Sequence, residues 1–192
     1  MTSLFAFVDE SYPRSGAFCV IGAIIAANEN IGSLESVCVT LEKSTGKHKR
    51  KWGETEVSRR LEYFKGIYKS NLCHFAYATF PTVTIRDNTV AALTHIVDFF
   101  GVTVAIIDGL PKTMYADYAL RVRKRTHKPI QIKGANDQNT PVLRLADSLC
   151  GLVKDSLWDD DDAAQHLLVT LESKGGVTNL TPPTSGDMAN RT

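Results

Sequence analysis

The sequence predicts an α/β protein with a mixed five-stranded sheet covered by helices on both faces. Short apolar segments typical of strands alternate with longer segments whose apolar residues recur at helical spacing. The first two apolar segments, residues 4–8 and 17–27, are joined by a turn-rich stretch, which indicates a hairpin. After the hairpin, strands and helices alternate, which favours a sheet with helices on both sides.

Two helices are predicted between residues 31 and 70, on either side of a basic loop. In each of them the apolar residues recur every three or four positions, so that they form one face of a helix. The first stripe is Leu34, Val37, Cys38 and Leu41, and the second is Val57, Leu61, Phe64, Ile67 and Tyr68.

The middle of the chain repeats a strand–helix pattern. The predicted elements are a strand over 72–80, a helix over 84–100, a strand over 102–108, a helix through 114–125 and a short fifth strand over 129–133. In such sheets, ligands gather outside the carboxyl ends of the strands.

The next helix is well signalled, with Thr140 at the N-cap and Pro141 at the first helical position. A last helix is predicted to start in the acidic run 159–162 and to end at Gly175. Helix capping explains that acidic run better than calcium binding, because it lacks the spaced ligands and the glycine of an EF-hand loop. We therefore expect one domain over residues 1–175 and a disordered tail over 176–192, which is rich in Pro, Ser, Thr and Asn.

The net charge of +1 conceals a strong polarisation. Residues 47–60 carry a charge of +4 and residues 121–128 carry +5, so the rest of the chain sums to −8. This distribution is typical of a protein that meets a polyanion on one face and holds cations with acids elsewhere.

Four cysteines without CxxC spacing suggest free thiols in a reducing compartment. The longest apolar stretch is too short to span a bilayer, and no signal peptide is visible. The expectation is a cytoplasmic protein without a membrane partner.

Three carboxylates stand out by their positions. Asp9 and Asp108 each end a predicted strand, and Asp147 lies on a mainly apolar helix face, where an unpaired carboxylate is costly. Asp108 could be a simple turn residue, and Asp147 could form a salt bridge with Arg144. Gly151, one turn after Asp147, would make sense if another group approaches the helix there.

Converging carboxylates repel one another unless a cation joins them. Hard divalent ions such as Mg²⁺ or Mn²⁺ prefer oxygen ligands, so they suit this set better than zinc does. Two such ions can activate a water and stabilise the leaving oxygen of a phosphodiester.

The motifs FVDES (7–11), AIIDG (105–109) and LRLADSLCG (143–151) together resemble domain-of-unknown-function family 3800. The resemblance implies an RNase H-like fold, a metal-dependent nuclease activity and a nucleic-acid partner. It also implies that Asp9, Asp108 and Asp147 bind the metals, and that the two helices between 31 and 70 form an insertion after the second strand.

The chain departs from the family pattern at two points. Lys49 stands where members often have a Glu, and a fourth acidic ligand stays open among Glu10, Glu54, Glu56 and Asp87. Glu10 is included as a candidate metal ligand, although strand alternation points Asp9 and Glu10 to opposite faces.

The basic runs supply the candidate nucleic-acid contacts. Phosphate contact is expected at Lys51 in particular, and Trp52 could stack on a base or anchor the loop to the core. The full set is Lys49, Arg50, Lys51, Trp52, Arg123 and Arg125.

The resulting hypothesis is a two-metal nuclease that hydrolyses phosphodiester bonds of RNA or DNA. Two alternatives stay open: an inactive nucleic-acid-binding module, and a metal-dependent phosphohydrolase of a nucleotide or another small phosphate ester.

Overall fold

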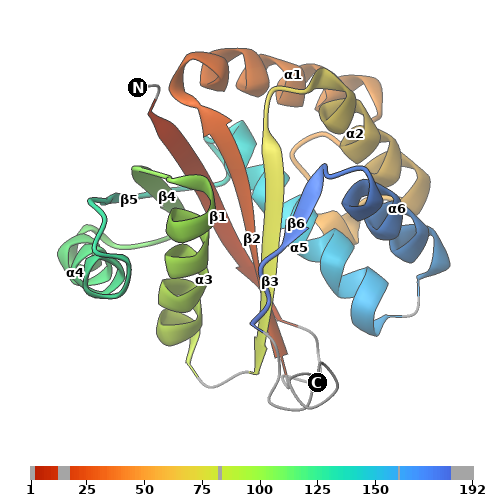
Figure 1. The fold of residues 1–192 in the computed structure, drawn as a ribbon. Helices are drawn as coiled ribbons and strands as arrows, with labels where there is room; N and C mark the ends of the chain where they lie inside the picture. Colours follow the sequence, from red (N-terminus) through yellow and green to blue (C-terminus); the bar gives the residue numbers. More distant parts are fainter. Residues whose placement is uncertain (1–2, 13–17, 82–83, 160, 183–192) are drawn as a thin grey trace.

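The computed structural model describes residues 3–12, 18–81, 84–159 and 161–182. A mixed sheet forms its middle layer, and helices cover both faces, as predicted (Figure 1). The strands are β1 (Leu4–Ser11), β2 (Phe18–Ala27), β3 (His74–Pro81), β4 (Val104–Asp108), β5 (Gln131–Ala135) and β6 (Val177–Asn179). The helices are α1 (Ile31–Ser44), α2 (Val57–Ser70), α3 (Ile85–Phe100), α4 (Tyr115–Thr126), α5 (Pro141–Trp158) and α6 (Asp162–Ser173).

The strand order is β5-β4-β1-β2-β3-β6. The predicted hairpin is confirmed, since β1 and β2 pair antiparallel. Strands β1, β4 and β5 run parallel to one another, so their carboxyl ends meet at one edge of the sheet. The helical insertion after β2 is also confirmed, because α1 and α2 both precede β3.

The prediction of five strands was wrong, because the described part of the chain contributes six. The sixth strand, β6, lies within residues 176–192, which were predicted to be a disordered tail. The buried Val177 pairs with Phe75, and the Leu180 amide donates to the Tyr77 carbonyl. A three-residue strand is too short to show an alternating pattern, and its stability comes from the neighbouring strand. Residues 183–192 of that predicted tail lie outside the described residues.

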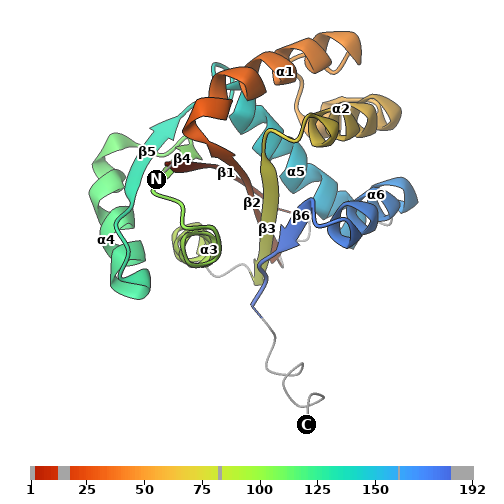
Figure 2. The same cartoon turned by 45° about the horizontal axis from the view of Figure 1, so that its top comes forward.

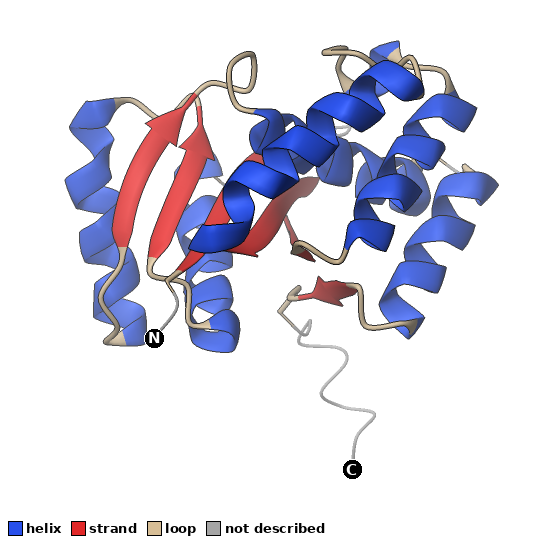
Figure 3. Ribbon diagram, turned by 90° about the horizontal axis from the view of Figure 1, so that it is seen from above, coloured by secondary structure: helices blue, strands red, loops and turns tan. Residues whose placement is uncertain are grey.

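Two separate cores fill the spaces on either side of the sheet. The core on one face is formed with α1, α2, α5 and α6, and the core on the other face with α3 and α4 (Figures 2 and 3). Along β1, Phe5 and Phe7 contact the first core and Ala6 and Val8 the second. This alternation decides which face each acid at the end of β1 reaches.

No helix in the described ranges is both long and apolar enough to cross a membrane.

Candidate active site

Asp9 and Asp108 lie side by side at the carboxyl edge of the sheet. The parallel register of β1 and β4 ends on the pair Val8–Ile107, and each acid is the next residue of its strand. Neighbouring strands are about 4.8 Å apart. Phe7 and Ile106, two residues earlier in each strand, both contact the core under α5. Both carboxylates therefore face α5.

The helix α5 packs closely on the hairpin and brings Asp147 to the same place. A Cβ atom on Gly22 of β2 would lie 2.7 Å from Cys150 Sγ and 3.3 Å from the Ala146 carbonyl oxygen. The Cys150 thiol donates to the carbonyl of Asp9 at 3.3 Å. Asp147 lies between Ala146 and Cys150 along the helix, so the three acids predicted to converge reach one face of the sheet.

Asp9 is the most strongly perturbed of these acids. It is 7% exposed, and burial raises the pKa of its carboxyl to about 8. The hydrogen bond from the Glu10 amide to Asp9 Oδ1, 2.8 Å long, lowers this pKa, whereas the charges of Asp147, Glu10 and Asp108 raise it further. Asp9 is thus a buried carboxyl whose ionised form is not balanced by the protein.

Lys51 is the cation that the chain itself brings to the acids. Burial lowers the pKa of Lys51, but Asp147, Asp137 and Asp9 together raise it above its ordinary value. Its Nζ lies 3.4 Å from Asp137 Oδ2. Burial also raises the pKa of Asp147, while Lys51, the Trp52 amide and Lys47 lower it.

Asp137 is an acid of this site that the sequence reasoning missed. It follows β5, whose carboxyl end lies beside that of β4. Its amide donates to Asp108 Oδ1 at 2.9 Å, and its charge raises the pKa of both Asp108 and Asp147. The signal was available, because Asp137 lies two residues beyond a strand parallel to β4, at the edge where ligands gather.

The four proposed fourth ligands have other positions. Glu10 follows Val8 in alternation and lies on the α3–α4 face of the sheet, away from α5. Glu54 accepts a hydrogen bond from the Lys51 amide, Glu56 pairs with Arg59, and Asp87 pairs with Arg121. Asp137 therefore fits the role of a fourth acidic metal ligand better than any of these four residues.

The donor set is chemically suited to a hard divalent ion, although the present side-chain positions do not form a ligand cage. Among the described residues, no three acidic, histidine or cysteine side chains are close enough to hold a metal. Each of the three aspartates is instead turned towards a backbone amide, that of Glu10, Asp137 or Trp52. All the nearby donors are carboxylate oxygens, the ligands that Mg²⁺ and Mn²⁺ prefer.

Trp52 anchors the basic loop to the core, one of the two roles predicted for it, and its burial leaves little of the ring for stacking on a base. It is 4% exposed, its amide donates to Asp147 Oδ2 at 3.3 Å, and its indole Nε1 donates to Asp155 Oδ2 at 2.7 Å. A Cβ atom on Gly151 would lie 2.2 Å from Trp52 Cγ. The group that approaches α5 at Gly151 is therefore this indole.

Two buried ion pairs hold the elements around the loop. Arg60 lies over the Trp52 ring, with Cζ 4.7 Å from the ring centroid, and pairs with Asp155 at 2.9 Å. Arg144 forms a bidentate pair with Glu42 at 2.7 and 2.9 Å. The alternative in which Arg144 neutralises Asp147 was therefore wrong, because Arg144 points to α1.

The first basic run reaches the acids. Lys49, Arg50 and Lys51 are exposed on the loop before Trp52, and Lys49 Nζ donates to the Gln138 carbonyl at 3.5 Å. A polar cavity of about 550 Å³ lies beside this loop. Its lining consists of Lys49, Lys51, Asp137, Gln138, Asn139 and Arg144.

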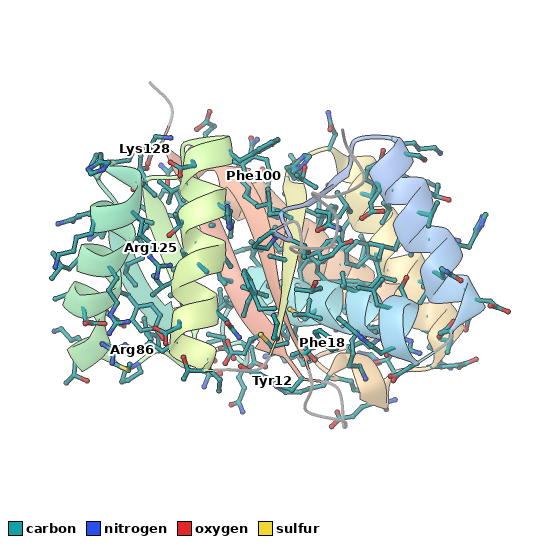
Figure 4. The ribbon with its side chains drawn as sticks, turned by 60° about the horizontal axis from the view of Figure 1, so that its bottom comes forward. Tyr12, Phe18, Arg86, Phe100, Arg125 and Lys128 are labelled. Carbon is teal, nitrogen blue, oxygen red and sulfur yellow. The ribbon has the colours of Figure 1, made fainter. Side chains whose placement is uncertain are left out.

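The second basic run lies at the other end of the sheet. Arg123 donates to the Ile130 carbonyl, and residue 131 begins β5, opposite the edge with Asp108. In Figure 4, Arg125 and Lys128 lie on the part of the molecule away from Tyr12, which follows β1. The structure thus separates Arg123 and Arg125 from the acids, because α4 runs back along the sheet.

The comparisons with known proteins support the fold. The RNase HII of the PCNA–RNase HII complex from Archaeoglobus fulgidus is similar to this chain, with a TM-score of 0.54 and 14% sequence identity. The similarity covers 90% of each chain. No family model and no curated protein matches the sequence. The chain has an RNase H-like α/β fold.

The raised pKa of Asp9 predicts how the metal-free protein responds to pH. In the unfolded chain Asp9 ionises near its ordinary pKa of 3.8, whereas in the folded protein it retains its proton up to about pH 8. The folded state is therefore progressively destabilised as the pH rises from about 4 to about 8. Asp9→Asn should raise the free energy of unfolding by about 1–3 kcal/mol at pH 8.5 in EDTA, and by much less at pH 4.

Urea unfolding of both proteins at the two pH values measures this difference. Glu62→Gln, which removes an exposed carboxylate on α2, is the control. It should change the free energy of unfolding by the same small amount at both pH values. If Asp9→Asn raises the free energy of unfolding by the same amount at pH 4 and at pH 8.5, the raised pKa of Asp9 is contradicted.

The contact at Gly151 predicts a second stability effect. Gly151→Ala should lower the free energy of unfolding by about 1–3 kcal/mol, because the new methyl group displaces the Trp52 ring. Gly32→Ala in α1 is the matched control, since a Cβ there meets nothing within 4 Å and the helix gains up to about 1 kcal/mol. Tryptophan fluorescence during urea unfolding follows both variants, and equal stability of the two would rule out the packing role.

Proposed function

We propose that this protein is a metal-dependent nuclease that hydrolyses phosphodiester bonds, and that it is a member of domain-of-unknown-function family 3800. The observation that carries the proposal is the grouping of Asp9, Asp108 and Asp147 on one face of the carboxyl edge of an RNase H-like sheet. A buried acid and two half-buried acids with raised pKa values, close together, are typical of functional sites.

In this proposal Asp9, Asp108 and Asp147 hold Mg²⁺ or Mn²⁺, with Asp137 as the fourth acid. The metal, when bound, supplies Lewis-acid stabilisation of charge on the phosphate oxygens and an activated water. The Asp9 carboxylate must be deprotonated to bind a cation, so metal binding and loss of its proton are coupled.

The chain's own residues orient the substrate. Lys49 and Lys51 provide cationic side chains along the polar cavity, where a nucleic-acid backbone would pass, and Arg50 is exposed on the same loop. Burial of Trp52 and its bond to Asp147 fix the loop relative to the acids. Lys51 pairs with Asp137 in the metal-free protein, and it can turn to a phosphate once a metal balances the acids.

The test of this proposal is cleavage of labelled single-stranded RNA, RNA–DNA hybrid and duplex DNA in Mg²⁺ or Mn²⁺. We expect turnover of at least one substrate, reduced by about 10³-fold or more in Asp9→Asn, Asp108→Asn and Asp147→Asn. Asp87→Asn is the control, because Asp87 is exposed on α3 and pairs with Arg121. It should retain activity.

The rival functions give different results in the same assay. Salt-sensitive binding without turnover would identify a binding module, and hydrolysis of mononucleotides alone would identify a phosphohydrolase. Thermal unfolding with and without Mg²⁺ adds a readout independent of turnover, because an ion that binds only the folded state raises the melting temperature. That increase should disappear in Asp147→Asn.

The positions of the two basic runs predict unequal roles in nucleic-acid binding. Lys51→Gln should weaken binding of a single-stranded oligonucleotide and lower the slope of log K against log salt concentration by about 1, as for one lost phosphate contact. Arg125→Gln removes an equal charge at the far end of α4 and should leave the slope unchanged. Fluorescence anisotropy titrations at several salt concentrations measure both slopes, and a larger effect for Arg125 would refute this placement of the substrate.

A further inference from the structure

A second cavity opens at the same edge of the sheet, on the α3–α4 side and opposite Asp9 and Asp147. It has a volume of about 260 Å³ and lies among the end of β4, the start of α3 and α4. The residues that matter for its chemistry are Glu10, Arg86, Asp108, Leu110, Met114 and Tyr118. Asp108 is shared with the candidate active site, so whatever occupies this cavity lies next to the acids.

Glu10 contributes an acceptor for which the described residues provide no donor. Strand alternation turns its side chain away from Asp9 and into the α3–α4 side of the sheet. Its carboxylate forms no hydrogen bond or ion pair with any residue in the described ranges. A half-buried carboxylate without a partner is costly, and a bound group with N–H donors would remove that cost.

Arg86 contributes an unused donor to the same cavity. Its Nη2 pairs with Asp117 of α4, which fixes the guanidinium at the mouth of the cavity. The Arg86 side chain is 41% exposed, so its guanidinium can also donate to a group outside the protein. Figure 4 shows Arg86 at the same end of the molecule as Tyr12, the residue that follows β1.

The walls between these two groups are apolar or aromatic. Leu110, Met114 and the ring of Tyr118, which is 4% exposed, form surfaces against which a flat ring can pack. The volume lies below the range of about 300–1,000 Å³ that holds drug-sized ligands, so it suits a single ring system. The cavity is therefore complementary to a planar heterocycle with N–H donors on one side and an acceptor on the other.

We propose that this cavity binds a guanine base. Guanine presents two adjacent N–H donors, N1–H and N2–H, which match the two oxygens of the Glu10 carboxylate. Its O6 and N7 are the acceptors that arginine commonly recognises, and here Arg86 is the donor. Uracil and thymine have only one N–H donor, and adenine has no N1–H, so Glu10 discriminates against all three.

The inference rests on the proposed nuclease function where it concerns the substrate. With the base of one nucleotide in the cavity, the shared Asp108 places the neighbouring phosphate beside the acids. The protein would then cleave RNA or DNA preferentially next to guanine. Binding of guanine itself does not depend on that function and can be measured separately.

The first experiment measures binding of free nucleosides to the full chain in EDTA, by ¹H–¹⁵N correlation spectra. Guanosine should bind about tenfold or more tightly than inosine, which lacks the N2 amine, and than uridine, because a hydrogen bond to a charged group is lost. Glu10→Gln should lower guanosine affinity by about tenfold or more, and Met114→Trp should abolish binding by filling the cavity. Glu62→Gln is the matched control and should bind guanosine as the wild type does.

The second experiment compares cleavage of oligonucleotides that differ by a single base, in Mg²⁺ or Mn²⁺. The wild type should cut next to guanine about tenfold faster than next to uracil or thymine, and Met114→Trp should lose that preference while it still cuts guanine-free substrates. Equal affinity for guanosine, inosine and uridine overturns the inference. If guanosine binds but cleavage shows no base preference, the proposal that the cavity holds the base next to the scissile phosphate is overturned. Guanosine binding without cleavage of any substrate leaves the cavity assigned and refutes the proposed nuclease.

Discussion

The close packing of α5 on the β1–β2 hairpin is the contact on which the site depends. Gly22 leaves the room that the Cys150 thiol occupies, and that thiol donates to the backbone carbonyl of Asp9. A larger residue at position 22 would push the helix outwards, and Asp147 with it. The distance between the helix and the sheet therefore affects both causes that raise the pKa of Asp9: burial, which is the larger, and the charge of Asp147.

The same helix also holds the basic loop. Trp52 is bonded to Asp147 through its amide and to Asp155 through its indole, and it fits against Gly151. One side chain thus links the loop that carries Lys51 to the helix that carries an acid. One packing arrangement therefore positions Lys51 and the acids, whereas the second basic run lies at the other end of the sheet.

The alternation of β1 divides the edge of the sheet into two environments. Asp9 faces α5 and joins Asp108, Asp147 and Asp137 in a cluster of negative charge. Glu10, the next residue, faces the α3–α4 side and a partly apolar cavity. Adjacent residues of one strand therefore lie in different environments: the first among other acids, and the second beside apolar and aromatic walls.

The sequence by itself determined the order of elements, the hairpin, the opposite orientations of Asp9 and Glu10, and the placement of Asp9 and Asp108 at strand ends and of Asp147 on a helix. Each of these follows from local periodicity, because the alternation of a strand and the repeat of a helix are written in consecutive residues. The burial of Trp52, the Arg144–Glu42 pair and the sixth strand were decided only by the tertiary structure. They depend on contacts between residues 102 or 103 positions apart in the sequence, for which no local pattern exists: β6 is stabilised by β3, Trp52 by α5 and Arg144 by α1.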